Sequence, residues 1–419
     1  MKIFVSAYAC EPYYGSEPGI GWNFCNEMCK HHDVWVLTRA NNQSAIDDYY
    51  ALNGGQPSSL HFLYYDLPRW LAFWKRKRFG YRQYYYLWQI GAYWKYQHYV
   101  NTSGFDIVHH LTFANIAMPS LFMCCKPVTI WGPIGLFPIP KPIMKSLPWR
   151  IRIGESIRKA IMWLLMHMDP LRLITEYSAD CIIEEPNRYF PSCFHTKALI
   201  RQLYQTGLNW HDPDYKLPPK TEHKDGKVRL LICSEFYHWK GVTYSCEIFG
   251  RIARKRKDVE LSIYGRGIEE KNMRHILEKH GVSDKVSWYG YVKKHEMLLA
   301  QQKHDKLLYP TYHHGLATLV LQAMYAGIPI VGMAGDAVAD TIADGIGLVA
   351  SGNTMPDILD DLEKKTLQLI DSAELRRQCI CRERELLQER FDWKIMVNKM
   401  CALYDEVIFA SKRQCEKCV

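Results

Sequence analysis

The clearest signal of the fold lies in residues 309–333, which read YPTYHHGLATLVLQAMYAGIPIVGM. A short apolar run ends at Pro310, a loop with two histidines follows, and a helical pattern begins near Leu316. A Gly-Ile-Pro break at residues 327–329 then separates this helix from a second apolar run. Strand, loop, helix and strand in this order form the repeating unit of a parallel α/β sheet.

The same alternation extends along the whole chain, interrupted by the charged and proline-rich residues 216–227, KLPPKTEHKDGK, which predict a linker. We expect an α/β fold with one doubly wound domain at residues 1–215, a second at residues 228–390, and a helical tail at residues 391–419. The expected strands are residues 2–7, 34–38, 61–65, 106–110, 128–131 and 181–184 before the linker, and 228–233, 259–264, 286–289, 306–309 and 328–331 after it.

The composition is that of a globular protein of 419 residues and 49.1 kDa, which corresponds to two or three domains of ~150 residues. Hydrophobic residues make up 48% and charged residues 23%, which excludes a disordered or low-complexity chain. The net charge of +9 suits a phosphate-bearing small molecule, an anionic membrane surface or nucleic acid. Among the 14 cysteines, the terminal pair Cys415 and Cys418 has no second pair at the spacing of a zinc site, so we expect no metal.

Targeting and membrane-spanning segments are not expected. The apolar run of the N-terminal MKIFVSAYACEP stops at Glu11, which is too short for a signal-peptide core and predicts a first strand instead. The uncharged residues 315–335 approach the length of a membrane span, but they contain the Gly-Ile-Pro break and therefore predict a short helix and a buried strand. We accordingly expect a cytoplasmic protein.

Residues 69–99 combine many basic and aromatic side chains and contain no acidic residue. Tyr81, Tyr84, Tyr85 and Trp88 recur at helical spacing. One interpretation is a helix packed on the first sheet beside a basic turn; the other is a surface that docks on anionic lipid headgroups. Nucleic-acid binding is not expected, because no recognition motif accompanies the segment.

Two strand ends in the first half carry candidate site residues. After the first strand, Gly15 and Ser16 stand in GSEPGIGW, where we expect Ser16 to cap a helix beginning near Pro18 and the backbone to approach a phosphate. His109 and His110 end the strand in FDIVHHLTF, at the sheet edge where open α/β sheets bind ligands. Because adjacent strand residues face opposite ways, we expect one histidine to face a ligand cleft; a buried, hydrogen-bonded histidine is the alternative for each.

In the second half, Lys240 ends a strand in a Trp-Lys-Gly turn, from which its ammonium can reach a phosphate. His314 and Gln322 stand eight residues apart, about two helical turns, on similar sides of a loop and helix. Backbone N–H groups at the start of that helix also suit a phosphate. These groups belong to Gly315, Leu316, Ala317 and Thr318.

Taken together, these segments resemble the family-4 (group 1) retaining nucleotide-sugar glycosyltransferases, which have the GT-B fold of two Rossmann-like domains. The resemblance covers nearly the whole chain and includes GSEPGIGWN, DIVHHLTF, the WGPIG turn at 131–135, the Trp-Lys-Gly turn, the YGRG turn at 264–267 and GLATLVLQAMYAGIPIV. The terminal RFDWKIMVNKMCALYDEV is similar to the helix that crosses back to the first domain in that family. The N-terminal motifs are most similar to those of bacterial enzymes that assemble capsule, exopolysaccharide or lipopolysaccharide sugars.

This resemblance implies a reaction without metal or other cofactor, in which a nucleotide-diphosphate sugar donates its sugar to a glycan or lipid-linked acceptor with retention. It places the donor in the second domain and the acceptor in the first, at the cytoplasmic face of a bacterial membrane. It implies that Lys240, with Arg266 as a second cation by position, holds the diphosphate. It also implies that His109 or His110 orients a sugar.

The sequence departs from the family at three donor-site positions. The family usually has Glu at both ends of a Glu-x7-Glu element, where this chain has His314 and Gln322. The first Glu contacts the donor sugar and the second accepts hydrogen bonds from the ribose. Glu235 stands where an Arg usually helps to hold the diphosphate. The departures leave open a catalytically degenerate homologue that acts as a sugar-binding or partner-binding subunit. A phosphorylase would need a cofactor-bearing lysine that the sequence does not identify.

Overall fold

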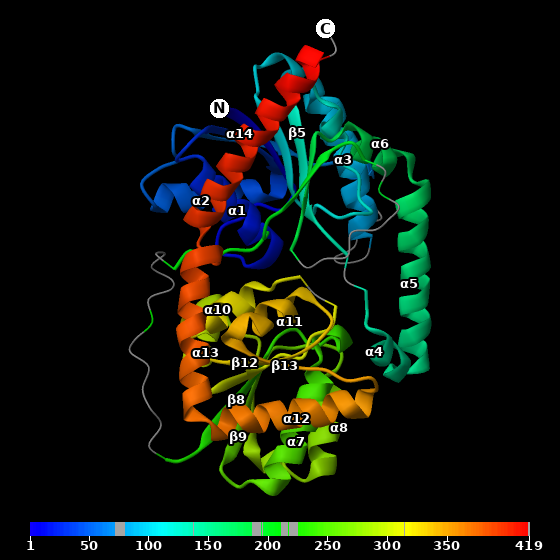
Figure 1. Cartoon of the computed structure of the whole chain (residues 1–419). Helices are drawn as coiled ribbons and strands as arrows, with labels where there is room; N and C mark the ends of the chain where they lie inside the picture. The colour runs from blue at the N-terminus through cyan, green and yellow to red at the C-terminus, as the bar shows by residue number, and fades with distance from the viewer. Residues whose placement is uncertain are drawn as a thin grey trace. The chain divides into compact units, whose positions relative to one another are not determined.

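The computed structural model describes residues 1–71, 80–136, 138–186, 194, 196–210, 217, 225–313 and 315–417. The chain divides into two compact units (Figure 1). Unit 1 consists of Met1–Leu136, Gly154–Gln205 and Trp393–Val419, and unit 2 consists of Phe137–Ile153 and Thr206–Asp392. In the described part of the chain, we find no helix with the length and apolar character needed to cross a bilayer.

Unit 1 is built on a parallel sheet with the strand order β3-β2-β1-β4-β5-β6-β7. The central strands are apolar and almost wholly buried, as parallel sheets covered on both faces require. The strands are β1 (Lys2–Ala7), β2 (Asp33–Arg39), β3 (Leu60–Tyr65), β4 (Ile107–Thr112), β5 (Val128–Ile134), β6 (Cys181–Glu184) and β7 (Leu199–Gln202). The main helices are α1 (Ser16–Met28), α2 (Gln43–Leu52), α3 (Tyr81–Thr102), α5 (Trp149–Met168, in unit 1 from Gly154), α6 (Pro170–Ser178) and α14 (Trp393–Lys417).

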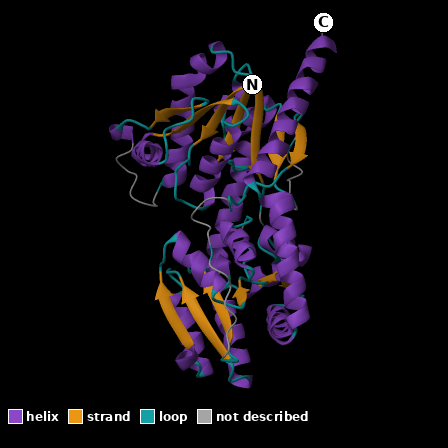
Figure 2. Ribbon diagram, turned by 90° about the vertical axis from the view of Figure 1, so that its left-hand side faces the viewer, coloured by secondary structure: helices purple, strands orange, loops and turns teal. Residues whose placement is uncertain are grey.

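Unit 2 has a second parallel sheet, with the order β10-β9-β8-β11-β12-β13. Figure 2 shows its strands as orange arrows with purple helices packed along them. The strands are β8 (Val228–Cys233), β9 (Val259–Tyr264), β10 (Val286–Gly290), β11 (Lys306–Leu308), β12 (Ile330–Met333) and β13 (Gly347–Ala350). The helices are α4 (Lys141–Ser146), α7 (Val242–Lys255), α8 (Glu270–His280), α9 (Lys294–Gln302), α10 (Thr318–Ala326), α11 (Ala337–Thr341), α12 (Met355–Asp371) and α13 (Ala373–Leu386).

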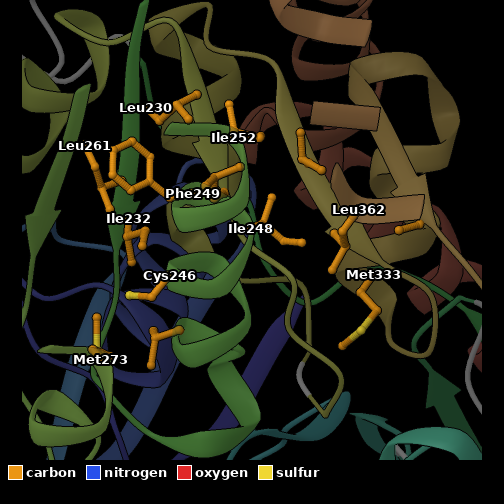
Figure 3. Packing of buried hydrophobic residues seen from close by; sticks show 14 of the residues in the cluster. Leu230, Ile232, Cys246, Ile248, Phe249, Ile252, Leu261, Met273, Met333 and Leu362 are labelled. Atoms are coloured by element: carbon orange, nitrogen blue, oxygen red, sulfur yellow. The ribbon is translucent and has the colours of Figure 1, made fainter. Parts of the chain in front are cut away.

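Each unit has its own hydrophobic core. In unit 1 the alternation of β1 sends Ile3 and Val5 into a cluster with α1 and α14, and Phe4 into a second cluster with α3. In unit 2 the apolar face of α7 packs against β8, where Phe249 lies near Leu230 (Figure 3). Since each core is closed within one unit, each unit positions its own site residues.

The two parallel sheets confirm the expected α/β class of doubly wound domains. All eleven expected strands are present, with ends that differ from the expectation by three residues at most. The sequence missed β7 and β13, which have four residues each. In β7 the sequence LIRQ alternates half-buried and exposed residues at the edge of the sheet and has no apolar run, so no periodicity marks it as a strand.

The predicted domain boundaries need correction. Residues 137–153, expected in the first domain, belong to unit 2, because Ile143 and Leu147 pack into its core. Unit 2 resumes at Thr206 rather than after the linker, since the backbone N–H of Leu208 donates to the carbonyl of Phe391 at 2.7 Å. The linker at residues 216–227 falls mostly outside the described residues. Helix α14, expected to return to the first domain, lies in unit 1.

Candidate functional site

The carboxyl ends of β8, β9 and β11 bring three turns of unit 2 together. The backbone N–H of Phe236, after β8, donates to the carbonyl of Arg266, after β9, at 3.0 Å. The N–H of Tyr312, after β11, donates to the carbonyl of Trp239 at 3.3 Å. Parallel sheets bind ligands at this edge, because the turns that leave the strands converge there.

Two glycines make this close approach of the turns possible. Gly241 has φ +66°, and a Cβ there would lie 2.0 Å from the carbonyl oxygen of Pro310. Gly265 has φ +131°, and a Cβ there would lie 1.8 Å from the carbonyl oxygen of Ser234. The Trp-Lys-Gly and YGRG turns therefore need glycine for backbone conformation and for contact with neighbouring turns.

Lys240 is the buried cation of this edge. Its residue is 9% exposed, and its ammonium donates to the hydroxyl of Tyr309 at 3.2 Å. Burial lowers the pKa of Lys240 to about 8, although the carboxylates of Glu235 and Asp336 act in the opposite direction. An ammonium that is poorly solvated and only partly balanced by carboxylates gains more from an arriving phosphate than an exposed lysine does.

Asp336 and Tyr309 complete the surroundings of Lys240, and the sequence did not single out either of them. Asp336 caps α11, accepting from the backbone N–H of Ala339 at 3.0 Å and from the hydroxyl of Thr311. Burial raises the pKa of Tyr309 well above its usual value, so its phenol stays protonated and can donate a hydrogen bond. A carboxylate near a lysine in three-dimensional space leaves no signal in a single sequence.

Glu235 and Arg266, both predicted donor-site residues, lie exposed on adjacent turns. The guanidinium of Arg266 lies 5.0 Å from the centre of the Tyr291 ring. Arg266 thus has the position of a second cation at this edge, beside the turn that holds Glu235. Its role in holding a diphosphate stays a prediction.

The loop before α10 holds the remaining predicted residues of unit 2. The helix begins at Thr318 rather than near Leu316, with Ala317 as an extended N-cap. The carbonyl of Leu316 accepts from the hydroxyl of Thr206 at 3.1 Å, which fixes the loop that also contains Gly315. Gln322 is 6% exposed within α10. His314 lies outside the described residues, so its relation to Gln322 stays a prediction.

In unit 1, His109 and His110 are both fully buried, so the expectation that one faces an open cleft is wrong. His109 Nε2 lies 2.9 Å from the carbonyl of Gly132, which can only accept, so Nδ1 accepts from the hydroxyl of Tyr404 at 2.6 Å. His110 pairs with Ser6 at 3.1 Å and with the hydroxyl of Tyr85 at 2.9 Å. Burial lowers the pKa of His109 to about 4 and that of His110 to about 3. These contacts give both neutral rings a structural role, and their catalytic assignment stays a prediction.

The turn after β1 also differs from the expectation. Helix α1 begins at Ser16 with Gly15 as the N-cap, so Ser16 does not cap a helix that starts near Pro18. Ser16 has φ +57°, a conformation that non-glycine residues rarely adopt. Phe113, at the end of β4, has the same φ of +57°. Such backbone strain persists only where the surrounding structure holds it, which is frequent at ligand sites.

Glu17, which the sequence alone did not single out, follows Ser16 and connects this turn to Phe113. Its carboxylate accepts from the backbone N–H of Phe113 at 3.0 Å, and burial raises its pKa to about 7. It lines a pocket of about 820 Å³ within unit 1. The other walls of the pocket come from α3, the loop after β4 and α5, represented by Tyr85, Asn115 and Met162. The size and mainly apolar lining are those of a small-molecule site with few polar groups.

The aromatic face expected in residues 69–99 belongs largely to the core. Tyr84, Tyr85 and Trp88 are buried against the sheet, as in the helix-packing interpretation, and Tyr81 is exposed. Lys75, Arg76, Lys77 and Arg78 lie outside the described residues. Among the described residues, no group of three His, Cys, Asp or Glu side chains could hold a metal ion.

Comparisons with known proteins show similarity to glycosyltransferases. Residues 215–386 match the model of the family Glycosyl transferases group 1. An uncharacterized glycosyltransferase of Haemophilus influenzae is 24% identical over 137 residues, which are 32% of this chain and 38% of that protein. The chain spans less than half the length of the first curated relatives that it matches.

Two solved structures have a similar fold over nearly the whole chain. WaaG, a glycosyltransferase involved in lipopolysaccharide biosynthesis, has a TM-score of 0.61 at 16% identity and covers 96% of this chain and 99% of its own. Anabaena Alr3699/HepE, in complex with UDP and glucose, has a TM-score of 0.59 at 12% identity and covers 97% of this chain and 100% of its own. With two Rossmann-like units and a second unit that matches the group 1 model, the chain has the GT-B fold and is similar to the group 1 glycosyl transferases.

Proposed function

We propose that this protein is a retaining glycosyltransferase that moves a sugar from a nucleotide-diphosphate sugar to a glycan or lipid-linked acceptor. The observation that carries the proposal is Lys240, a buried ammonium among the converging turns of a unit that matches the group 1 family. The role that we infer is bacterial surface polysaccharide synthesis at the inner face of the cytoplasmic membrane. The similarity to WaaG supports this role.

In the proposed reaction, the bond between the anomeric carbon and the diphosphate oxygen breaks. The acceptor hydroxyl forms the new bond on the same face of the sugar, and its proton leaves with the diphosphate. Lys240 stabilises the negative charge that develops on the leaving group, and the backbone N–H groups at the start of α10 add to this effect. Arg266 would supply a second positive charge to the leaving diphosphate.

The acceptor is assigned to the pocket of unit 1. Its apolar walls suit the non-polar part of an acceptor, and the Glu17 carboxylate can accept a hydrogen bond from a hydroxyl. We propose that no metal ion takes part, because Lys240 and the helix amides supply the positive charge. The expected result is that EDTA leaves the transfer rate unchanged; restoration by Mg²⁺ after an EDTA-induced loss would contradict this part.

The proposal is tested by isothermal calorimetry with UDP, GDP, ADP and their common sugar conjugates. We expect one nucleotide sugar to bind and Lys240→Met to weaken binding by about ten-fold or more, since a hydrogen bond to a charged group contributes about 1.5–3 kcal/mol. Lys271→Met, at an exposed lysine of α8, is the matched control and should bind like the wild type. The panel is repeated with membrane extract as a source of acceptor.

The second candidate is binding without turnover, favoured by the neutral Gln322 in a buried position where the family usually has a carboxylate. It predicts that the sugar nucleotide binds but is never consumed, with or without acceptor. Restoration of turnover in Gln322→Glu would identify this position as the cause. Absence of binding by every nucleotide at millimolar concentration would contradict both candidates.

A further inference from the structure

The pocket of unit 1 contains a carboxylate with no cation beside it. Glu17 lines the pocket, and its carboxylate accepts from the backbone N–H of Phe113 at 3.0 Å. Two neutral groups, this N–H and the side-chain amide of Gln205, stabilise the ionised form of Glu17. The charged group that acts on Glu17 within the described part of the chain is another carboxylate, that of Glu185, which is 6% exposed. Because buried anions are ordinarily paired with a cation, a cationic group that enters the pocket would be stabilised there.

Two tyrosine hydroxyls in the pocket wall can only accept hydrogen bonds from a ligand. The hydroxyl of Tyr86 donates its one proton to Asp169 Oδ1 at 2.9 Å. The hydroxyl of Tyr85 lies 2.9 Å from His110 Nε2 and 3.2 Å from the carbonyl of Phe113, so its proton is used in either case. Both tyrosines line the pocket and keep a lone pair. A ligand that bonds to them must therefore bring its own protons.

Aromatic rings line the same space, contributed by Tyr81, Tyr85, Tyr86 and Phe113. The faces of such rings carry partial negative charge, and aromatic rings are the usual walls of sites for ammonium groups. The cation that lines the pocket, Arg82, is exposed and donates from Nε to the hydroxyl of Tyr81, itself 41% exposed, at 3.0 Å. Its charge thus lies at the outer wall, away from the buried Tyr85.

An ammonium group fits this arrangement better than a hydroxyl or an anion. A hydroxyl supplies one proton to Glu17 and leaves the negative charge unbalanced, whereas an ammonium supplies up to three protons and balances the charge. A carboxylate or phosphate in the same place would be repelled by Glu17 and Glu185.

We propose that the acceptor held in this pocket carries a protonated amino group, which binds the carboxylate of Glu17 and the hydroxyl oxygens of Tyr85 and Tyr86. The chemical class is that of amino sugars and amino alcohols, in which a separate hydroxyl receives the sugar. This assignment rests on the proposed function, which gives the pocket to the acceptor, and deepens it by making Glu17 the residue that selects for an amine. Binding of the amine requires neither nucleotide nor sugar transfer.

The test is isothermal calorimetry of the full-length protein with three probes of similar shape, 2-phenylethylamine, 2-phenylethanol and phenylacetate. At pH 8 we expect the amine to bind about ten-fold or more tightly than the alcohol, because its hydrogen bonds to the carboxylate are charge-assisted, and phenylacetate to bind least. Glu17→Gln should reduce the affinity for the amine to that for the alcohol. Asp48→Asn, which removes an exposed carboxylate of α2, is the matched control and should bind like the wild type.

The pH dependence separates recognition by Glu17 from a merely structural role. Burial raises the pKa of Glu17 to about 7, so about a tenth of the carboxylate is ionised at pH 6 and about nine-tenths at pH 8. The affinity for the amine should therefore rise about ten-fold over this range, and the affinity for the alcohol should stay constant. His110, beyond Tyr85, does not contribute, because burial lowers its pKa to about 3, and Arg82 stays protonated throughout. Glu17→Gln should abolish the trend.

Three outcomes would overturn the proposal. They are equal affinity of the wild type for the amine and the alcohol, tightest binding of phenylacetate that is lost in Arg82→Met, and absence of binding by all three probes at millimolar concentration. The wild-type comparison decides even if circular dichroism shows that Glu17→Gln does not fold. Nucleotide calorimetry reports on the donor site of unit 2 separately, so loss of nucleotide binding with amine binding intact would contradict the proposed function and not the amine site.

Discussion

At the scale of single residues, the pKa of Lys240 determines the pH range in which the proposed donor site can work. Burial lowers this pKa to about 8, so the ammonium is the main form at pH 7 and about a tenth of the population at pH 9. We predict that the affinity for UDP-glucose falls about ten-fold between these pH values, because deprotonation removes the charge that attracts the diphosphate.

Calorimetry at pH 7, 8 and 9 measures this dependence. Lys240→Arg is the informative variant, because a guanidinium stays protonated throughout. Its affinity should be independent of pH over this range even if the larger group weakens binding overall. An equal decline in the wild type and in Lys240→Arg would show that another group titrates.

The site residues that the sequence predicted are those with a local signal. Lys240 could be predicted because it stands in a glycine turn directly after an apolar strand. The structure has it at the carboxyl edge of the sheet, after β8. Glu17, Tyr309 and Asp336 could not be found in the same way, because each acquires its environment from segments distant in the chain. The prediction that His109 or His110 faces a cleft failed for a different reason. Their position at the end of a strand was predicted correctly, but the sequence does not show which segments cover the two side chains.

At the scale of elements, the turn between β8 and α7 should be among the least tolerant parts of unit 2. Gly241 and Gly281 have nearly equal φ angles, +66° and +68°, but a Cβ meets Pro310 at the first and nothing within 4 Å at the second. We predict that Gly281→Ala destabilises by about 1–2 kcal/mol, the cost of a left-handed alanine. Gly241→Ala should cost more, because the turn must also move away from Pro310.

Urea denaturation of the two variants provides the comparison, read as the shift of the unit 2 transition. Because the φ angles of Gly241 and Gly281 are nearly equal, backbone strain contributes equally to both variants. The difference between their free energies of unfolding therefore measures the cost of separating Gly241 from Pro310. Equal shifts would mean that the turn relaxes freely and that its packing on Pro310 contributes little.

Among the elements, long periodic segments were predictable and short or context-dependent ones were not. Strands β1, β6, β8 and β9 end where the apolar runs end. Helix α4 was predicted in the first domain but belongs to unit 2. Ile143 and Leu147 are apolar enough to pack in either core, and the sequence alone does not show which core they join. Helix α5 has a clear apolar period, but the sequence does not reveal that Ile157, Ile161 and Leu164 are exposed.

At the scale of the whole molecule, the two units should lose stability under different pH conditions. In unit 1, His109 and His110 are neutral when buried and protonated when unfolded below pH 6.5. Their contribution to stability therefore falls as the pH drops from 6.5 towards about 4 for His109 and about 3 for His110. In unit 2, the folded state binds fewer protons at Lys240 than the unfolded state between about pH 8 and 10.5, so its stability rises with pH there.

Scanning calorimetry at pH 5, 7 and 9 tests this with single variants. His110→Gln should relieve a cost on the order of 2 kcal/mol in the unit 1 transition at pH 5, and Lys240→Met should stabilise unit 2 at pH 7. Neither variant should move the transition of the other unit. If both transitions shift together, the units unfold as one cooperative body.

The placement of α14 in unit 1 has a consequence for folding during synthesis on the ribosome. Strand β1 is synthesised before α14 but shares its core with Val397 and Tyr404 of that helix, and His109 forms its hydrogen bond with the same tyrosine. At 5–20 residues per second, roughly 20–80 s separate the synthesis of β1 from that of α14. During that interval Ile3 and Val5 lack their final cover, whereas unit 2 has its whole sequence once Asp392 has been added. Unit 2 can therefore fold on the nascent chain, whereas unit 1 must be kept from aggregating until α14 has been synthesised.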